Sequence, residues 1–438
     1  MIVHYLHKTV SLGLCAIALT VASAAAQTAF HVIAYRDRLG GPGGIVEGSP
    51  SLLYFATGTD SAILSITPQG TETVLTTFPS GYQMLGPVVS APNGRFYDVV
   101  AVGANPANVF SVGGAAGSRQ LYASQSSAPF LTQNLPDGNL LGTAVGIGDN
   151  PWYVASVGLK GAVTPIYQFP AGDVALTVTY ASDGNYYGLA ENGPGYLFRV
   201  TPSGVLTKLV SFPSGSVLPN SYTPLLQASD GNLYGVTNFG GTNSAGTVYK
   251  VTLSGQYTLL YTFPNDQNSF PSALIEGSDG NLYGATLGHI TGGGHSELFR
   301  ITKSGQYTLL FAMSNITAAG ACQCSLVQGS DGNIYGTAIS GGPNNGGVIF
   351  ELELGLPIPA PAAQRFSPGS GAAGTQVLLW GSNLLSASVQ FNGVAATTVS
   401  NSGSNYILAT VPTGATTGPI TITTPGGTVT TKENFTVE

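Results

Sequence analysis

The chain has 438 residues, of which only 8% are charged, against roughly a quarter in ordinary soluble domains. It contains 61 glycines and 27 prolines, but 43% of the residues are hydrophobic, so we expect ordered domains with large cores rather than a disordered chain. The net charge is −7, and lysines and arginines do not cluster. This balance argues against nucleic acid and anionic membranes as partners.

The first 26 residues have the pattern of a secretory signal peptide. They contain one lysine, an apolar run over residues 10–21 and small residues at 24–26. The run is too short to span a membrane comfortably, and no second long apolar stretch follows it. We therefore expect cleavage after Ala26 and a soluble mature protein outside the cytoplasm, extracellular or periplasmic, without a transmembrane segment.

A short phrase then recurs along the chain, and its best copies read SDGNLYG at 229–235 and 278–284. Successive copies are 43, 44, 46, 47, 49 and 52 residues apart when they are aligned on the turn residues Pro50, Asn93, Asp137, Asp183, Asp230, Asp279 and Asp331. A period of 40 to 50 residues with strand-like content is typical of propeller blades.

One repeat shows how each unit is built. From Pro224 onward it divides into four strand-length runs, PLLQAS, LYGVTNF, GTVYKVT and QYTLLYTF, separated by short turns that contain glycine. Four antiparallel strands per unit, repeated seven times, predict a seven-bladed β-propeller over residues 27–354. The seventh unit lacks its fourth strand, and residues 30–36, FHVIAYR, have the alternation of that strand. We expect them to pair with the last unit and close the ring.

The segments DGNLYGVTNFGGTNSAGTVYKVTLSG and DGNIYGTAISGGPNNGGVIFEL resemble the GloVer-type tandem repeats of secreted bacterial proteins. The resemblance is strong in units four to seven, whereas the first three units are degraded copies. It implies a repeat architecture and an extracellular location, but no particular chemistry.

A second domain follows a stiff Pro-rich linker at 355–364. Residues 365–438, with runs such as FSPGSGAAGTQVLLWGSNL and VQFNGV, resemble a TIG (IPT) domain, an immunoglobulin-like β-sandwich. The matching positions are Pro368, Gly371, Gly374, Gly381, Asn392, Gly393, Pro412, Gly418 and Phe435. Because Arg365 and Lys432 are its only cations, we expect a spacer or adhesive module rather than a DNA-binding one.

Cys322 and Cys324 are the cysteines left after removal of the signal peptide. Two thiolates cannot complete a zinc site alone. A bridge between such close neighbours requires a local bend, so a strained disulfide and two free thiols both stay open.

Two groups of residues are candidates for a site. On the face that gathers the variable loops, Tyr222, Phe239 and Phe270 are candidates for stacking against sugars, and His289, His295 and Glu297 form a possible metal cluster or a solvated loop. Around the central channel, the residue three positions before each turn anchor is polar, including Glu47, Gln227, Glu276 and Gln328. Glu47 and Glu276 are either an acid and base or an ion clamp, or they line a water-filled channel. Asp183, Asp230, Asp279 and Asp331 fit turns better than calcium sites.

The pattern as a whole favours a secreted, non-catalytic binding or adhesion protein. It would recognise extracellular polysaccharide or a cell-surface partner through the variable-loop face, with no cofactor and no metal. The alternative is a lyase or hydrolase. The segment SDGNYYGLAENGPGYLFRVTPSG resembles repeats of virginiamycin B lyase-type propellers. That resemblance implies a His, Glu and magnesium site on the loop face, for which His289, His295 and Glu297 are the comparable cluster.

Overall fold

A computed structural model describes most of the chain. The described residues are 29–35, 44–57, 62–79, 82–84, 86–102, 108–113, 118–122, 127–135, 137–146, 151–193, 195–212, 223–266, 268–288, 294–314, 325–339, 341–344, 346–401 and 403–438. The predicted signal peptide and the two cysteines lie outside these residues. Every regular element in the described ranges is a β-strand, and none of these ranges contains a helix that could span a membrane.

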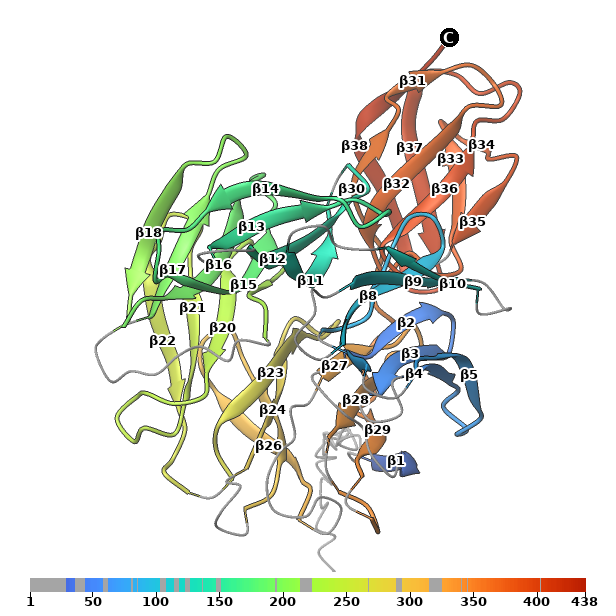
Figure 1. The fold of residues 1–438 in the computed structure, drawn as a ribbon. Coiled ribbons are helices and arrows are strands. Elements are labelled where there is room, and N and C mark those ends of the chain that lie inside the picture. Colours follow the sequence, from blue (N-terminus) through green and yellow to red (C-terminus); the bar gives the residue numbers. More distant parts are fainter. Residues whose placement is uncertain are drawn as a thin grey trace, which may run out of the picture.

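The described strands before residue 354 form seven antiparallel sheets, which follow one another around a ring in Figure 1. The strands of the first three sheets are β2 (Val46–Ser49), β3 (Leu52–Thr57), β4 (Ala62–Ile66) and β5 (Glu72–Thr77); β6 (Tyr82–Met84), β7 (Val89–Ser90), β8 (Arg95–Val102), β9 (Asn108–Gly113) and β10 (Ser118–Tyr122); and β11 (Ser127–Asn134), β12 (Leu140–Gly146), β13 (Trp152–Val157) and β14 (Val163–Gln168). The strands of the next three are β15 (Val174–Tyr180), β16 (Tyr186–Glu191), β17 (Gly195–Val200) and β18 (Leu206–Ser211); β19 (Leu226–Gln227), β20 (Leu233–Thr237), β21 (Thr247–Val251) and β22 (Tyr257–Thr262); and β23 (Pro271–Glu276), β24 (Leu282–Thr286), β25 (Glu297–Ile301) and β26 (Tyr307–Ala312).

The last of these sheets joins the two ends of the ring. It consists of β27 (Ser325–Gln328), β28 (Ile334–Ala338), β29 (Val348–Glu353) and β1 (Ala29–Tyr35). β1 contains most of the segment expected to close the ring, and it runs antiparallel to β29 with Phe30 opposite Leu352. The first and last sheets also share a core, in which Leu53 and Phe55 pack with Ile349.

One repeated residue pair explains how each sheet packs. The tyrosine of the phrase is buried, with Tyr234 0% and Tyr283 2% exposed, and a glycine follows it. A Cβ atom added to Gly284 would lie 2.2 Å from the ring of Phe299 on the next strand, and one added to Gly336 would lie 2.3 Å from the ring of Phe350. Glycine is therefore required at this position, because the aromatic ring of the third strand lies across the backbone of the second.

The C-terminal part of the chain forms two further sheets around a separate core. One contains β30 (Ala362–Ser367), β32 (Gln376–Ser382), β36 (Tyr406–Thr410) and β35 (Val399–Asn401). The other contains β31 (Ser370–Gly371), β38 (Gly427–Val437), β37 (Gly418–Thr424), β33 (Ser388–Phe391) and β34 (Val394–Ala395). Leu379, Phe391, Ile407 and Phe435 are buried between them. The predicted domain start at 365 falls inside β30, which begins at Ala362.

The packing of β1 gives a first prediction, because neighbouring residues of this strand have different surroundings. Phe30 stacks on Phe311 of the sixth sheet, with ring centroids 4.1 Å apart, whereas His31 is exposed beside Glu353. We expect Phe30→Ala to lower the free energy of unfolding by about 2 kcal/mol, because a half-buried ring contributes less than the 3–5 kcal/mol of a fully buried one. The matched control His31→Ala should cost less than about 1 kcal/mol, as exposed ion pairs do. Equal effects in denaturant unfolding would contradict this account of the closure.

Candidate functional site

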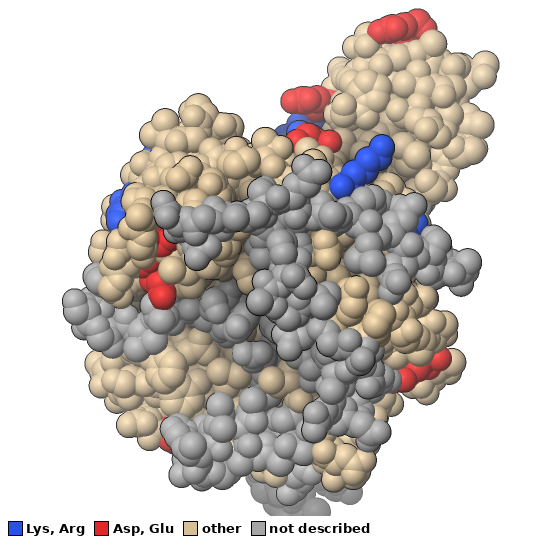
Figure 2. Space-filling view, viewed as in Figure 1, with Lys and Arg blue, Asp and Glu red and all other residues tan. Residues whose placement is uncertain are grey.

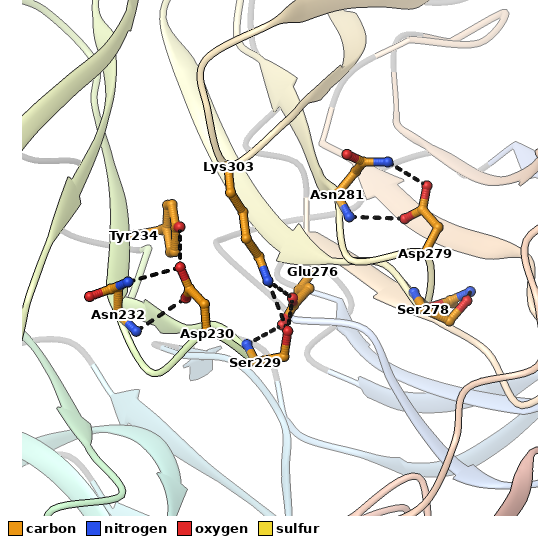
Figure 3. Close-up of polar contacts among 10 residues, drawn as sticks. Ser229, Asp230, Asn232, Tyr234, Glu276, Ser278, Asp279, Asn281 and Lys303 are labelled. Atoms are coloured by element: carbon orange, nitrogen blue, oxygen red, sulfur yellow. Dashed lines mark hydrogen bonds and ion pairs between the residues drawn. The ribbon is translucent and has the colours of Figure 1, made fainter.

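The aspartates of the repeated phrase are engaged in their own turns. Figure 3 shows Asp230, whose Oδ1 accepts the backbone N–H of Asn232 at 3.1 Å, while its Oδ2 accepts Asn232 Nδ2 and the Tyr234 hydroxyl at 2.8 Å each. The same three bonds occur around Asp183 and Asp279. Burial alone would raise the pKa of Asp230, but the hydrogen bonds from Asn232 and Tyr234 hold it below its usual value. These contacts favour turn structure over calcium binding.

The serine before each of these aspartates joins one unit to the next. Glu276 of the sixth unit accepts the backbone N–H of Ser229 at 2.7 Å and the Ser229 hydroxyl at 2.6 Å (Figure 3). Gln227 makes the corresponding pair with Ser182 of the unit before it, and Gln328 with Ser278. We call this pair of hydrogen bonds, between the serine of one unit and the Glu or Gln of the next, the serine latch.

The latch also spans the closure of the ring. Glu47 of the first unit accepts the backbone N–H of Ser330 of the seventh unit at 2.8 Å and its hydroxyl at 2.7 Å. Glu47 is 5% exposed, and burial raises its pKa, against the opposing effect of the hydrogen bonds from Ser330 and Ser51. The residues expected to line a water-filled channel therefore bind neighbouring units together, and Glu47 and Glu276 are each held by their own serine.

Among the described residues, Glu276 has one partner that Glu47, Gln227 and Gln328 lack. Lys303 Nζ lies 2.5 Å from Glu276 Oε1 and 2.8 Å from the Ser229 hydroxyl. This pair neutralises the carboxylate at the mouth of the channel. The first three units, which are degraded copies of the repeat, make other contacts between neighbouring units in place of the serine latch. Asn134 donates to the carbonyl of Ser90, and Gln133 donates to the carbonyl of Tyr180 at 3.3 Å.

On the variable-loop face the structure brings four of the predicted residues into two adjoining pairs. The rings of Phe239 and Phe270 meet edge to face with centroids 5.3 Å apart, and His295 Nε2 lies 3.9 Å from Glu297 Oε1. Asn268, two residues before Phe270, accepts the backbone N–H of His295 at 3.0 Å and so connects the pairs. Tyr222 and His289 lie outside the described residues. We call Phe239, Phe270, Asn268, His295 and Glu297 the loop-face cluster.

The acidic residue of the loop-face cluster is half-buried. Burial and then the nearby Asp266 raise the pKa of Glu297, while hydrogen bonds from Asn268 and Tyr307 lower it. Across the described ranges, no three His, Cys, Asp or Glu side chains gather in a group that would hold a metal ion.

The structure also contains a cavity that the sequence did not predict. It has a volume of about 990 Å³ and lies at the end of the channel where the Asp-Gly-Asn turns gather. Its inner wall includes Leu226, Ile275 and Val327 from the first strands of their units, and its outer wall includes residues 358–360 and 404–405. In Figure 1 the C-terminal sheets lie at the upper right of the view, to one side of the ring of sheets. Sequence reasoning missed this cavity because its outer wall depends on how the second domain docks.

The fold defines the class of protein, a β-propeller built of repeats. Virginiamycin B lyase from Staphylococcus aureus, in a catalytically inactive form with quinupristin, is similar with a TM-score of 0.56 and 16% identity, over 74% of this chain and 99% of that one. An oligogalacturonate lyase in complex with manganese has a TM-score of 0.52 and 14% identity, over 76% and 97% of the two chains. A fungal alcohol oxidase in complex with copper has a TM-score of 0.51 and 11% identity, over 93% and 98%. At these identities the similarity shows the fold alone.

The family follows from the repeats themselves. The model of the Gloeobacter/Verrucomicrobia repeat matches residues 173–407, more than half of the chain, so the chain belongs to this family. The match begins at the fourth unit, where the repeat phrase becomes regular, and the predicted repeat β-propeller is confirmed. A search of curated proteins found no match.

The serine latch predicts which changes at position 276 are tolerated. Glu276→Gln reproduces the side chain that Gln227 and Gln328 use at the same place, so we expect a change in unfolding free energy below about 1 kcal/mol, mostly from the lost pair with Lys303. Glu276→Ala removes both hydrogen bonds of the latch, each of which contributes about 0.5–1.5 kcal/mol, and should cost about 1–3 kcal/mol. Thermal and denaturant unfolding of both variants test this. A Gln variant as unstable as the Ala variant would show that the charge, not the latch, matters.

A buried acid in the second unit predicts how stability depends on pH. Asp98 is fully buried, its Oδ1 accepts the backbone N–H of Val99 at 2.6 Å, and its Oδ2 has no partner in the described part of the chain. Burial raises the pKa of Asp98 well above its usual value, although hydrogen bonds from Val99 and Gly86 oppose the shift. A raised pKa in the folded state means that the folded protein holds this proton more tightly than the unfolded chain does.

The contribution of Asp98 to stability is therefore complete below the usual carboxyl pKa of about 4 and is lost as pH rises through the raised pKa. We expect Asp98→Asn to remove this loss, so that unfolding free energies measured from pH 4 to 9 fall less steeply than in the unchanged protein. Glu433→Gln, an exposed change in β38, is the control and should leave the slope unaltered. Parallel pH profiles for all three proteins would contradict the assignment.

Proposed function

We propose that this protein is a secreted binding or adhesion protein that recognises an extracellular polysaccharide through the variable-loop face of a seven-bladed propeller. Seven antiparallel sheets in the described residues and the pairing of β1 with β29 support the blade number and the closure. The two C-terminal sheets around one core support an immunoglobulin-like TIG (IPT) module, which would serve as spacer or adhesive unit. The signal-peptide pattern of residues 1–26 supports secretion.

The backbone of Phe270 is the observation that carries this proposal. Its φ is 73°, a left-handed value that is strained for a bulky residue. Two backbone hydrogen bonds maintain this conformation of Phe270. Its N–H donates to the carbonyl of Ala245 at 3.0 Å, and its carbonyl accepts the N–H of Leu287 at 2.8 Å. The strained residue presents its ring to Phe239, which remains 45% exposed. Strain that the surroundings maintain in this way is concentrated at functional sites.

The surroundings of these rings suit a neutral sugar. A pyranose ring has an apolar C–H face that can lie on an exposed aromatic ring and hydroxyls at its rim that require hydrogen-bonding partners. Asn268, His295 and Glu297 supply such groups beside the two rings. Only 8% of the residues are charged, and few of the described side chains coloured in Figure 2 carry a charge, as expected for a protein that recognises uncharged polymers rather than ionic ones.

The alternative function, a lyase or hydrolase resembling the virginiamycin B lyase-type enzymes, is supported by one observation. His295 and Glu297 lie 3.9 Å apart on the loop face, and burial raises the pKa of Glu297 as a general acid requires. Turnover of a bound polymer by the unchanged protein, lost in His295→Ala, would favour this function over binding alone.

The test of the binding function removes the exposed ring. We expect Phe239→Ala to weaken retention on the recognised polysaccharide about tenfold, as loss of an aromatic anchor typically does. The control Val205→Ala changes another exposed apolar residue, 57% exposed, in the turn between β17 and β18. The measurement is affinity electrophoresis on a panel of soluble polysaccharides, followed by binding to whole cells. Equal retention of both variants and the unchanged protein would overturn the placement of the site on this face.

A further inference from the structure

The cavity at the turn end of the channel is bounded on its outer side by the linker, which is fixed to the ring. The Ser278 hydroxyl donates to the carbonyl of Pro357 at 2.6 Å, and Gln328 Nε2 lies 3.5 Å from the same oxygen. Farther on, Gly403 approaches Ser90 so closely that an added Cβ would lie 3.0 Å from its hydroxyl oxygen. The C-terminal domain is thus joined to the ring at two separate places, and the cavity lies between them.

The serine latch leaves a hydrogen-bond donor for the linker at Ser278. Where the next unit supplies glutamate, as at Glu276, the carboxylate can only accept, so the serine hydroxyl donates to it. Where the next unit supplies glutamine, its Nε2 donates to the serine oxygen, as Gln328 does to Ser278 at 2.9 Å, and the hydroxyl proton is free for another acceptor. In Ser278 that acceptor is the linker carbonyl.

The same reasoning gives the cavity a hydrogen-bond donor of its own. Gln227 Nε2 donates to the Ser182 oxygen at 2.9 Å, so the Ser182 hydroxyl proton is likewise available, and Ser182 lines the cavity. Across the cavity, Asn383 donates its Nδ2 to the carbonyl of Ala360 at 3.0 Å, which leaves its amide oxygen as an acceptor. Ser404 and Asn405 add a hydroxyl and an amide on the same outer wall, where the Ser404 hydroxyl donates to Asn405 Oδ1 at 3.3 Å and the Asn405 amide NH2 remains as a donor.

The charged groups that line the cavity indicate whether its ligand is charged or neutral. Among the described residues that line the cavity, Glu47 and Glu276 are the titratable ones. Glu276 is paired with Lys303, and both carboxylates accept their latch serines. A charged ligand would lose its hydration here without gaining a free counter-charge. Hydroxyl and amide groups alternate instead with apolar side chains such as Leu226 and Ile275, which match the hydroxyls and the C–H faces of sugar rings.

We propose that this interdomain cavity is a second binding site, for a short uncharged oligosaccharide held between Ser182 of the ring and Asn383, Ser404 and Asn405 of the C-terminal domain. A volume of about 990 Å³ lies at the upper end of the range of small-molecule sites. The site extends the proposed function, but it involves other residues at the opposite end of the channel, so either proposal can fail alone.

The experiment uses the full secreted chain and isothermal titration calorimetry with cellohexaose, maltohexaose, xylohexaose and, as the charged comparison, tetragalacturonate. We expect at least one neutral hexasaccharide to bind and Ser404→Trp, which fills the cavity from the outer wall, to weaken that binding at least tenfold. The matched control Ser400→Trp places the same side chain on an exposed position of β35, away from the cavity, and should bind like the unchanged protein.

Two further variants keep the result interpretable. Ser182→Ala removes the donor without adding bulk and should weaken binding about fivefold, while melting temperatures confirm that each variant is folded. Val205→Ala, the exposed change in the turn between β17 and β18, should leave oligosaccharide binding unchanged. Polymer retention by Phe239→Ala is measured separately, because it reports on the loop face. The proposal is overturned if no neutral probe binds at about 1 mM, if tetragalacturonate binds more tightly than the neutral sugars, or if Ser404→Trp binds as the control does.

Discussion

The serine latch is the interaction that joins neighbouring units in the regular half of the ring and across its closure. In the fourth to seventh units the turn begins at a serine whose backbone N–H donates to the next unit around the ring, and each such hydrogen bond contributes to stability. The next unit supplies that acceptor through Gln227, Glu276 or Gln328, and Glu47 does the same for Ser330 at the closure. One contact therefore satisfies the turn, sets the spacing of neighbouring units and joins the last unit to the first.

This architecture uses most of the polar groups at the centre of the ring. The aspartates bind their own turns, the serines bind the next unit, and Lys303 neutralises Glu276. The proposed binding sites therefore use groups that the repeat does not need, namely the loops of the opposite face and the side chains brought in by the second domain. The loop-face cluster and the interdomain cavity are the places in the described chain where such groups gather.

The sequence predicted the repeat period, the four-stranded unit and the polar position before each turn, because these are local patterns. It did not predict what that position does. Glu276 contacts a serine 47 residues away and Glu47 one 283 residues away, and the orientation of one unit on the next is not visible in either segment. Phe239 and Phe270 were predicted as individual candidates for sugar stacking. Their edge-to-face contact depends on the strained backbone of Phe270, which no pattern in the sequence predicts. The cavity was missed for a similar reason, since its outer wall belongs to another domain.

The choice between glutamate and glutamine at the latch has a consequence beyond the ring. Both side chains satisfy the serine N–H, so stability alone does not distinguish them strongly. They differ in the direction of the second hydrogen bond, because glutamate takes the hydroxyl proton and glutamine leaves it free. The Ser278 hydroxyl donates this proton to the carbonyl of Pro357 in the linker. The Ser182 hydroxyl keeps its proton available for a hydrogen-bond acceptor on a ligand in the cavity. A single difference within the repeat thus leaves the hydroxyl protons of two serines for other acceptors, and the linker takes that of Ser278.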